Sequence, residues 1–430
     1  MCTFRLGQGI GSRRTRGLGL GTLCLNPHIA WYRKSNPVMI TPALRRIRRT
    51  HVWLGVMLAT GLGTAACAAD NETLKGALDE LRVTGGAPWG VKIPGIAAAV
   101  AHGSRGSIEM STAVSGVADP PGKTPLSSRS RFHVGSVTKT FTAALIMQLD
   151  QSGDLSLADP VSRWLDYPNG DSITVEMLLG HTSGLPDFSE LPGHRRIHTP
   201  QQSIALAARL PLLFPPGSKW SYCNTNYIML GVIAEKITGN AWADEIQSRF
   251  LTRLELNDTV IWLGHALPDT VPGSRLNCGM EGEPDCLKKP GFRIVPVVDG
   301  HDWKVAWSAG AMVSTPSDMA VWIHELMNGD LLDAEHRALM ATPTPQSMAA
   351  LSQMPAFGRL RWTAAGLGLM RYEIDGFGTG WGHEGSIDGF VANVVFMAES
   401  GRSVAVTSNF LQTDSFAVLG ELMQTVQSID

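Results

Sequence analysis

Alternating apolar and polar positions predict β-strands near both ends of the main body of the chain. Residues 95–102 and 106–116 are separated by a short Gly-Ser-Arg segment, a pattern typical of a β-hairpin. In the last third, runs rich in β-branched residues and bounded by glycines predict further strands. These runs are residues 366–374, 390–396 and 403–409. Strands from both ends of the body favour one antiparallel sheet.

The spacing of apolar residues predicts helices between and after these strands. The predicted helices are residues 72–82, a run that begins near Ser136, residues 155–165 and residues 415–426; residues 174–253 are mainly helical and interrupted by prolines. We therefore predict an α/β (α+β) fold, with an antiparallel sheet flanked by helices and an inserted all-helical domain. The predicted parts are an extension and signal peptide at 1–69, a sheet domain at 70–165 with 300–430, and the helical insertion at 166–299.

Charge divides the chain into a basic head and an acidic body. Ten of the 36 basic residues, and none of the 38 acidic ones, precede Asp70, so the body carries a net charge of −12. An acidic body argues against a nucleic-acid partner.

The basic head has the pattern of an export signal. A positive stretch at 45–49 precedes a short apolar stretch at 52–62, and Ala66-Cys67-Ala68 offers a cleavage site. The apolar stretch is too short for a good membrane span, and no transmembrane partner is implied. We predict a cleavable signal near residues 39–68 and a periplasmic or secreted bacterial protein. A lipid anchor at Cys67 is the less favoured alternative, because Thr64 stands where a lipoprotein signal usually carries Leu. Whether Met1 or Met39 begins the protein stays open.

Cysteine spacing predicts one disulfide and no metal site. Cys278 and Cys286 bracket a polar loop and could form a disulfide in an oxidising compartment. The chain has no C-x-x-C pair and no cluster of His and Cys. We predict no metal and no organic cofactor.

The first candidate for chemistry is Ser136-Val-Thr-Lys139 at the start of a predicted helix. Residues three apart share a helix face, so the Lys139 ammonium is predicted to lie beside the Ser136 hydroxyl. A serine becomes a nucleophile when a neighbour accepts its proton, and a partly desolvated lysine can do so. Taken alone, the motif fits equally well a helix-capping serine followed by a surface lysine.

A second motif, Tyr222-Cys-Asn224, precedes another predicted helix. A tyrosine beside a lysine has its phenolate favoured and is a candidate general base. Asn224 carries both a donor and an acceptor for an amide in the substrate. Tyr167-Pro-Asn169 has the same spacing, but its Asn-Gly sequence predicts a plain turn, so we favour Tyr222.

The third motif is His383-Glu384-Gly385-Ser386, near the start of a predicted late hairpin. A glycine lets a substrate backbone approach a strand closely, and it leaves backbone N–H groups free for an oxyanion. His383 could supply positive charge or a hydrogen bond near Tyr222. A histidine flanked by glycines is also common in ordinary turns.

Together, the motifs S-x-x-K, Y-x-N and H-x-G resemble those of the serine β-lactamase and penicillin-binding superfamily, in particular its class C β-lactamase-like branch. The resemblance extends from about Leu74 to the C-terminus. It includes the stretches 178–186, 216–217 and 308–318. It implies the β-lactamase/transpeptidase-like fold, with the site between an α/β domain and an all-helical domain.

The resemblance also implies a role for each residue. Ser136 would be acylated, Lys139 and Tyr222 would share proton transfer, and Asn224 would orient the acyl group. The N–H groups of Ser136 and Ser386 would form the oxyanion hole. His383 replaces the lysine of class C β-lactamases and is similar to the residue of D,D-peptidases, D-aminopeptidases and esterases of the group.

Glu384 bears on the substrate, because relatives that hold a substrate carboxylate usually carry Thr or Ser there. An ionised glutamate cannot donate a hydrogen bond and would repel that carboxylate. We therefore expect a substrate without a free carboxylate at that place: an ester, an amide, or a ligand with a cationic group. Two alternatives stay open. One is a D-alanyl-D-alanine carboxypeptidase or class C-like β-lactamase acting on peptidoglycan-like or β-lactam substrates. The other is a penicillin-binding sensor that acylates without turnover.

Overall fold

The computed structural model describes residues 62–85, 91–104, 107–119, 123–262, 264, 267, 269–277, 293–297 and 305–427. Its centre is a seven-stranded antiparallel sheet with the strand order β2-β1-β12-β11-β10-β9-β8. The strands are β1 (Gly95–Ser104), β2 (Ser107–Gly116), β8 (Leu360–Ala365), β9 (Met370–Ile374), β10 (Gly378–Ile387), β11 (Phe390–Met397) and β12 (Arg402–Ser408). The predicted sheet built from both ends of the body is confirmed, because β1 pairs with β12.

The predicted hairpin is confirmed as well, with Gly95 opposite Gly116 and Ser104 opposite Ser107. In the last third the structure differs at one place. The predicted strand at 366–374 is β-structured only from Met370, while residues 360–365 form a strand that the sequence did not predict. Within the described ranges, two small sheets accompany the large one. One contains β3 (Phe132–His133), β7 (Met312–Ser314) and β4 (Val260–Ile261), and the other contains β5 (Ser274–Leu276) and β6 (Ile294–Pro296).

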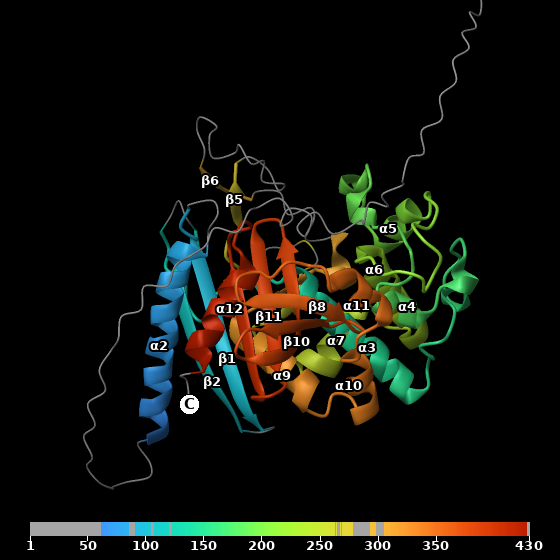
Figure 1. Ribbon diagram of the computed structural model, residues 1–430. Helices are drawn as coiled ribbons and strands as arrows, with labels where there is room; N and C mark the ends of the chain where they lie inside the picture. The colour runs from blue at the N-terminus through green and yellow to red at the C-terminus, as the bar shows by residue number, and fades with distance from the viewer. Residues whose placement is uncertain are drawn as a thin grey trace, which may run out of the picture.

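Each face of the sheet is covered by helices (Figure 1). On one face, α2 (Leu62–Thr84) and α12 (Ser415–Val426) pack leucines such as Leu78 and Leu419 against Val100 and Val404. On the other face, α9 (Pro316–Asn328) packs against the alternate residues of the same strands. Both faces of the central strands are therefore buried, which accounts for their nearly continuous apolar sequence.

The remaining helices gather beside the sheet, on the side where α4, α5 and α6 lie in Figure 1. They are α3 (Thr138–Ser152), α4 (Val175–Leu179), α5 (Pro200–Ala207), α6 (Asn224–Thr238), α7 (Trp242–Ile246), α10 (Ala334–Met340) and α11 (Pro345–Leu351); a π-helical turn, η6 (Gln247–Leu251), extends α7. The division into domains at residues 166 and 299 stays a prediction.

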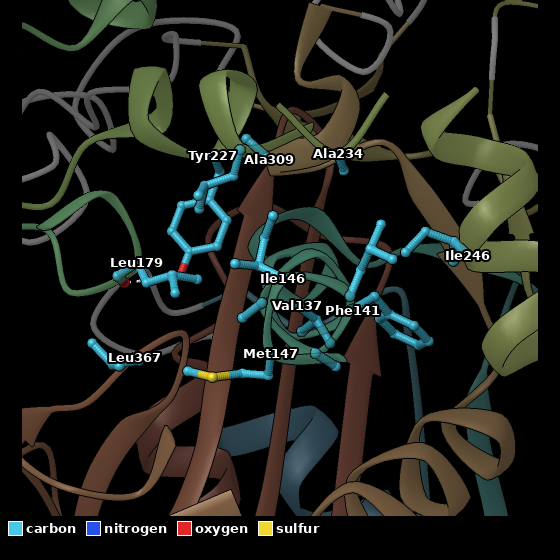
Figure 2. Close-up of a cluster of buried hydrophobic side chains, with 14 of the residues drawn as sticks. Val137, Phe141, Ile146, Met147, Leu179, Tyr227, Ala234, Ile246, Ala309 and Leu367 are labelled. Atoms are coloured by element: carbon cyan, nitrogen blue, oxygen red, sulfur yellow. Dashed lines mark hydrogen bonds between the residues drawn. The ribbon is translucent and has the colours of Figure 1, made fainter. Parts of the chain in front are cut away.

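Helix α3 lies in the middle of the apolar core (Figure 2). Phe141 stacks on Trp322 with ring centroids 3.6 Å apart and an interplanar angle of 8°. Tyr227 points toward Leu179, and its hydroxyl donates a 3.0 Å hydrogen bond to the Leu179 carbonyl oxygen. Since close-packed side chains resist displacement, the core holds α3 and the residues at its N-terminus in a fixed position.

The predicted helix at 155–165 is wrong. Only the 3₁₀ turn η2 (Val161–Arg163) forms there. The Asp159 carboxylate accepts from the backbone N–H of Ser156 at 2.8 Å, and Pro160 has no N–H to donate. Side chains that bond to nearby backbone groups compete with helical hydrogen bonds, and a proline removes one more.

Two sequence predictions fall on residues that the structure does not describe. Most of the predicted signal region, residues 1–61, and both Cys278 and Cys286 lie outside the described residues. Among the helices that are described, none is long and apolar enough to cross a membrane.

Candidate active site

The structure places Ser136 and Lys139 side by side at the start of α3. Ser136 lies in the 3₁₀ turn η1 (Gly135–Val137), which leads directly into the helix. In a 3₁₀ turn residues i and i+3 eclipse one another. Lys139 Nζ lies 3.0 Å from Ser136 Oγ. The lysine predicted as a possible surface residue is instead fully buried.

Lys139 Nζ has two further hydrogen-bond partners, both carbonyl oxygens. Nζ donates to Asn224 Oδ1 at 2.7 Å and to the backbone oxygen of Ala309 at 2.8 Å. Burial lowers the pKa of Lys139 from 10.5 to about 7, although the nearby Asp187, Cys223 and Glu384 oppose that shift. A substantial share of the side chain is therefore the neutral amine at neutral pH.

Tyr222 presents its ring to the lysine, with Lys139 Nζ 4.9 Å from the ring centroid. Burial raises the pKa of Tyr222 well above 10, and the Ser136 side chain opposes that shift. The phenol is therefore protonated at neutral pH, which differs from the phenolate base considered from the sequence.

Asn224 is held on three sides. Its side-chain nitrogen donates to Asp187 Oδ2 at 3.0 Å and to Ser189 Oγ at 3.2 Å, and its oxygen accepts from Lys139. Asn224 was predicted to contact the substrate, but here both amide hydrogens and the oxygen are used within the protein. Asp187 and Ser189 were not predicted from the sequence. The sequence feature that could have indicated them is Asp-x-Ser directly after Pro186. With this spacing the aspartate side chain caps the turn η4 (Phe188–Glu190).

The third motif lies on the part of β10 that is not paired with β9. Strand β9 pairs with β10 only over Gly378–Gly382, whereas β11 pairs with it as far as Ile387. The turn η1 packs against the part that β9 leaves free. A Cβ atom on Gly385 would lie 1.9 Å from the Val134 oxygen and 3.1 Å from the Ser136 nitrogen. Gly385 is therefore required for the close approach of Ser136 to this strand.

Gly135, in the η1 turn, lies equally close to strand β10. Its φ is +49°, in the left-handed region, and a Cβ there would lie 3.0 Å from the Ser386 nitrogen. The backbones of Ser136 and Ser386 thus meet at one point of the β10 edge, as an oxyanion hole made of their N–H groups requires.

His383 is buried, and burial lowers its pKa to about 3, with the Lys139 charge acting in the same direction. Its Nδ1 lies at the Glu384 backbone oxygen, so that nitrogen carries the proton and Nε2 is an acceptor. The rings of His383 and Tyr222 are 6.1 Å apart. Because the imidazole is neutral, it can contribute hydrogen bonding near Tyr222 but not positive charge.

Glu384 is half-buried, and burial raises the pKa of its carboxyl group to about 7, opposed by Lys139. No described residue forms a hydrogen bond or ion pair with this carboxylate. Its charge raises the pKa of both Lys139 and Tyr222. Among the described residues, the site thus contains a carboxyl group without a hydrogen-bond or ion-pair partner.

The second Y-x-N match, at Tyr167, forms the turn that its sequence predicts. Asn169 has a φ of 62°, and the Gly170 N–H bonds to the Tyr167 oxygen at 2.9 Å. The Tyr167 side chain belongs to the apolar core. No group of three or more His, Cys, Asp or Glu side chains that could hold a metal ion occurs among the described residues.

Comparison with known proteins identifies the family. The family model described as Beta-lactamase matches residues 83–426. A penicillin-binding protein of Bacillus subtilis (strain 168) is 33% identical over 162 residues; this alignment covers 36% of this chain and 36% of that relative, so about a third of the relative's length is matched. Penicillin-binding protein 4 of Amycolatopsis lactamdurans is 29% identical, with 68% of this chain and 77% of the relative covered.

Among solved structures, D-amino acid amidase from Ochrobactrum anthropi SV3, in complex with L-phenylalanine, is similar with a TM-score of 0.70. It is 25% identical, and the match covers 83% of this chain and 98% of the amidase. The fold predicted from the three motifs is thereby confirmed. The chain belongs to the β-lactamase family and is a serine hydrolase with the β-lactamase/transpeptidase-like fold.

Proposed function

We propose that the protein hydrolyses an ester or an amide through an acyl-enzyme on Ser136, and that its substrate lacks a free carboxylate beside Glu384. The observation that carries this proposal is the arrangement around Lys139 Nζ. Two carbonyl oxygens take its hydrogens, and Ser136 Oγ lies at 3.0 Å in the remaining direction. A neutral lysine held in this way directs its lone pair at the serine hydroxyl.

In the first step, Lys139 takes the Ser136 proton while Oγ attacks the carbonyl carbon of the substrate. The N–H groups of Ser136 and Ser386 bind the negative oxygen that develops. Tyr222, protonated at neutral pH, gives a proton to the leaving alcohol or amine, and the Lys139 ammonium restores it. In the second step, Lys139 takes a proton from the water that attacks the acyl carbon, and it returns a proton to Ser136 Oγ as the ester bond breaks and the acid leaves. No cofactor enters this scheme.

Two observations support the proposed substrate class: Glu384 and the structural neighbour. In its ionised form, which predominates above pH 7, the Glu384 carboxylate has no hydrogen-bond or ion-pair partner among the described residues, so it would attract an ammonium group and repel a carboxylate. The neighbour is named as a D-amino acid amidase. An amide or ester that carries an amino group fits both observations.

The similarity to penicillin-binding proteins supports a second candidate, a D,D-carboxypeptidase or β-lactamase. The same residues would act, but Glu384 would lie where those substrates carry their carboxylate. A non-turnover sensor is the third candidate; the buried, neutral Lys139 and the oxyanion site support turnover instead. We also retain the prediction of export to the periplasm or the medium, which rests on residues 39–68.

One experiment compares these candidates. The full-length protein is incubated with a p-nitrophenyl ester, a D-amino acid amide, a D-Ala-D-Ala peptide and a chromogenic cephalosporin, with Ser136→Ala as control. We expect turnover of the ester or the amino acid amide that is lost in Ser136→Ala. Turnover of the cephalosporin or peptide alone would support the second candidate, and a stable stoichiometric adduct would support the sensor.

A further inference from the structure

We propose that Asp187 is a positioning residue which, together with Ser189, fixes the orientation of the Asn224 amide and so aims the Lys139 lone pair at Ser136. This inference rests on the proposed roles of Ser136 and Lys139. It extends those roles by naming the residues that direct the Lys139 lone pair at Ser136 Oγ.

The orientation of Asn224 is determined by acceptors on one side. Asp187 Oδ2 accepts from the Asn224 backbone N–H at 2.8 Å and from its side-chain nitrogen at 3.0 Å. Ser189 Oγ gives its own hydrogen to Asp187 Oδ1 at 2.7 Å, so its lone pairs face the same side-chain nitrogen. Two acceptors surround the NH₂ group, and the amide oxygen must point the other way.

That oxygen meets Lys139 Nζ at 2.7 Å. The Ala309 backbone oxygen is a second obligate acceptor, at 2.8 Å. A neutral amine has two hydrogens and one lone pair, and the two oxygens take both hydrogens. Only the direction of Ser136 Oγ is left for the lone pair. If the Asn224 amide were reversed, its NH₂ group would face Nζ, and the lone pair would turn toward Asn224 instead of Ser136.

Asp187 also acts through its charge, since it opposes the effect of burial on the pKa of Lys139. Other titratable groups influence the same amine or lie against its site. They are Glu384, Cys223, His181, His383, Tyr222 and Tyr227. Burial keeps both histidines neutral, whereas Asp187 and Glu384 are the carboxylates that act on Lys139. Asp187 thus links the orientation of Asn224 to the protonation of the base.

Asp187 is not a group that touches the substrate. Both of its carboxylate oxygens are occupied, Oδ1 by the N–H and hydroxyl of Ser189 and Oδ2 by Asn224. Its neighbour on the chain, Phe188, is tied to Thr225 by a 2.9 Å hydrogen bond. Hydrogen bonds therefore join the η4 turn to the start of α6, and they keep Asp187 in a fixed position relative to Asn224.

The test measures how fast a fluorophosphonate labels Ser136 at pH 5 to 9, because this reaction reports the activated serine whatever the substrate is. Asp187→Asn keeps the size of the side chain but removes its charge. We expect the maximal labelling rate to be about 10-fold lower. We also expect the acid limb of the pH–rate profile, where the rate rises as Lys139 loses its proton, to move to lower pH by about one unit, because the Lys139 ammonium loses a stabilising negative charge. Ser189→Ala should slow labelling without shifting the limb. The double variant Asp187→Asn, Asn224→Asp should move the limb to higher pH.

Asp333→Asn is the matched control, because Asp333 also caps a helix but lies on the exposed start of α10. It should leave the profile unchanged. An unchanged profile in both Asp187→Asn and Ser189→Ala would overturn the inference while leaving the proposed function intact. Labelling without ester or amide turnover would contradict the proposed function alone. A wild-type protein that is never labelled would contradict both.

Discussion

His181 stacks on Tyr222, with ring centroids 4.5 Å apart and planes inclined by 27°. His181 itself has a φ of 57°, and its Nδ1 accepts the backbone N–H of Cys223 at 3.1 Å. The histidine therefore holds the Tyr222 segment by its ring and by a buried hydrogen bond. It lies in the stretch 178–186, for which the family resemblance supplied no function.

We predict that His181→Ala weakens both stability and activity. It leaves the buried Cys223 N–H without an acceptor, which costs about 1–3 kcal/mol in the free energy of unfolding. The loss of the stacked ring should lower the rate of Ser136 acylation by about 10-fold or more. Urea unfolding and fluorophosphonate labelling measure the two effects. His181→Asn is the control, because asparagine tolerates positive φ and can still accept a hydrogen bond; it should keep more stability than alanine. Equal stability of both variants would argue against the hydrogen bond.

We predict that Lys139 makes the stability of the protein pH-dependent. Its pKa is about 7 when folded and 10.5 in a model peptide, so the unfolded chain binds the extra proton between these values. Stability relative to Lys139→Met should therefore rise with pH, by about 1.4 kcal/mol per pH unit between pH 7 and 10, and stay level below pH 7. Denaturant unfolding of both proteins at pH 6 to 10 checks this. A constant difference over this range would show that Lys139 is not desolvated in solution.

We predict that Glu384→Thr increases acylation by carboxylate-bearing substrates. Above pH 7, where the Glu384 carboxyl group is mostly ionised, the change removes a repulsive charge and adds a hydroxyl donor, so labelling by a fluorescent penicillin should rise by about 10-fold or more. Turnover of a cationic amino acid amide should fall. Glu384→Gln separates the two causes, since it removes the charge without supplying a hydroxyl. Unchanged penicillin labelling in both variants would disprove the repulsion argument.

We predict that Gly385→Ala disrupts the site. The added methyl group would overlap the Val134 oxygen, so the strand and the η1 turn must separate. We expect a loss of about 100-fold or more in esterase activity and a destabilised fold. Gly76→Ala is the control, because nothing lies within 4 Å of a Cβ at that position in helix α2. The control should keep full activity; retained activity in Gly385→Ala would show that the oxyanion hole does not need this close approach.

The sequence predicted the N-terminal hairpin and the proximity of Ser136 and Lys139, because each follows from residues that lie close together in the chain. The hairpin at 95–116 follows from alternation and a glycine turn, and the spacing of Ser136 and Lys139 reflects one helical turn. These patterns need no knowledge of distant contacts. They also placed Tyr222 and Asn224 correctly at the start of an apolar helix.

Other features depend on contacts between distant segments and were therefore missed. Asp187 meets Asn224 across 37 residues, and nothing near either of them in sequence indicates the other. The protonation of Tyr222 and His383 depends on burial, which follows from packing and not from spacing. The predicted helix at 155–165 failed for the opposite reason: local side-chain hydrogen bonds and Pro160 outweighed a weak apolar pattern.

The sheet order has a consequence for the way the protein is made. Strand β12 lies between β1 and β11, so the N-terminal hairpin has no partner until the last strand has left the ribosome. Ser136 is synthesised early, but the edge of β10 that completes its surroundings comes some 250 residues later. The surroundings of Ser136 are therefore complete only after the C-terminal strands have been made and have paired with the N-terminal hairpin.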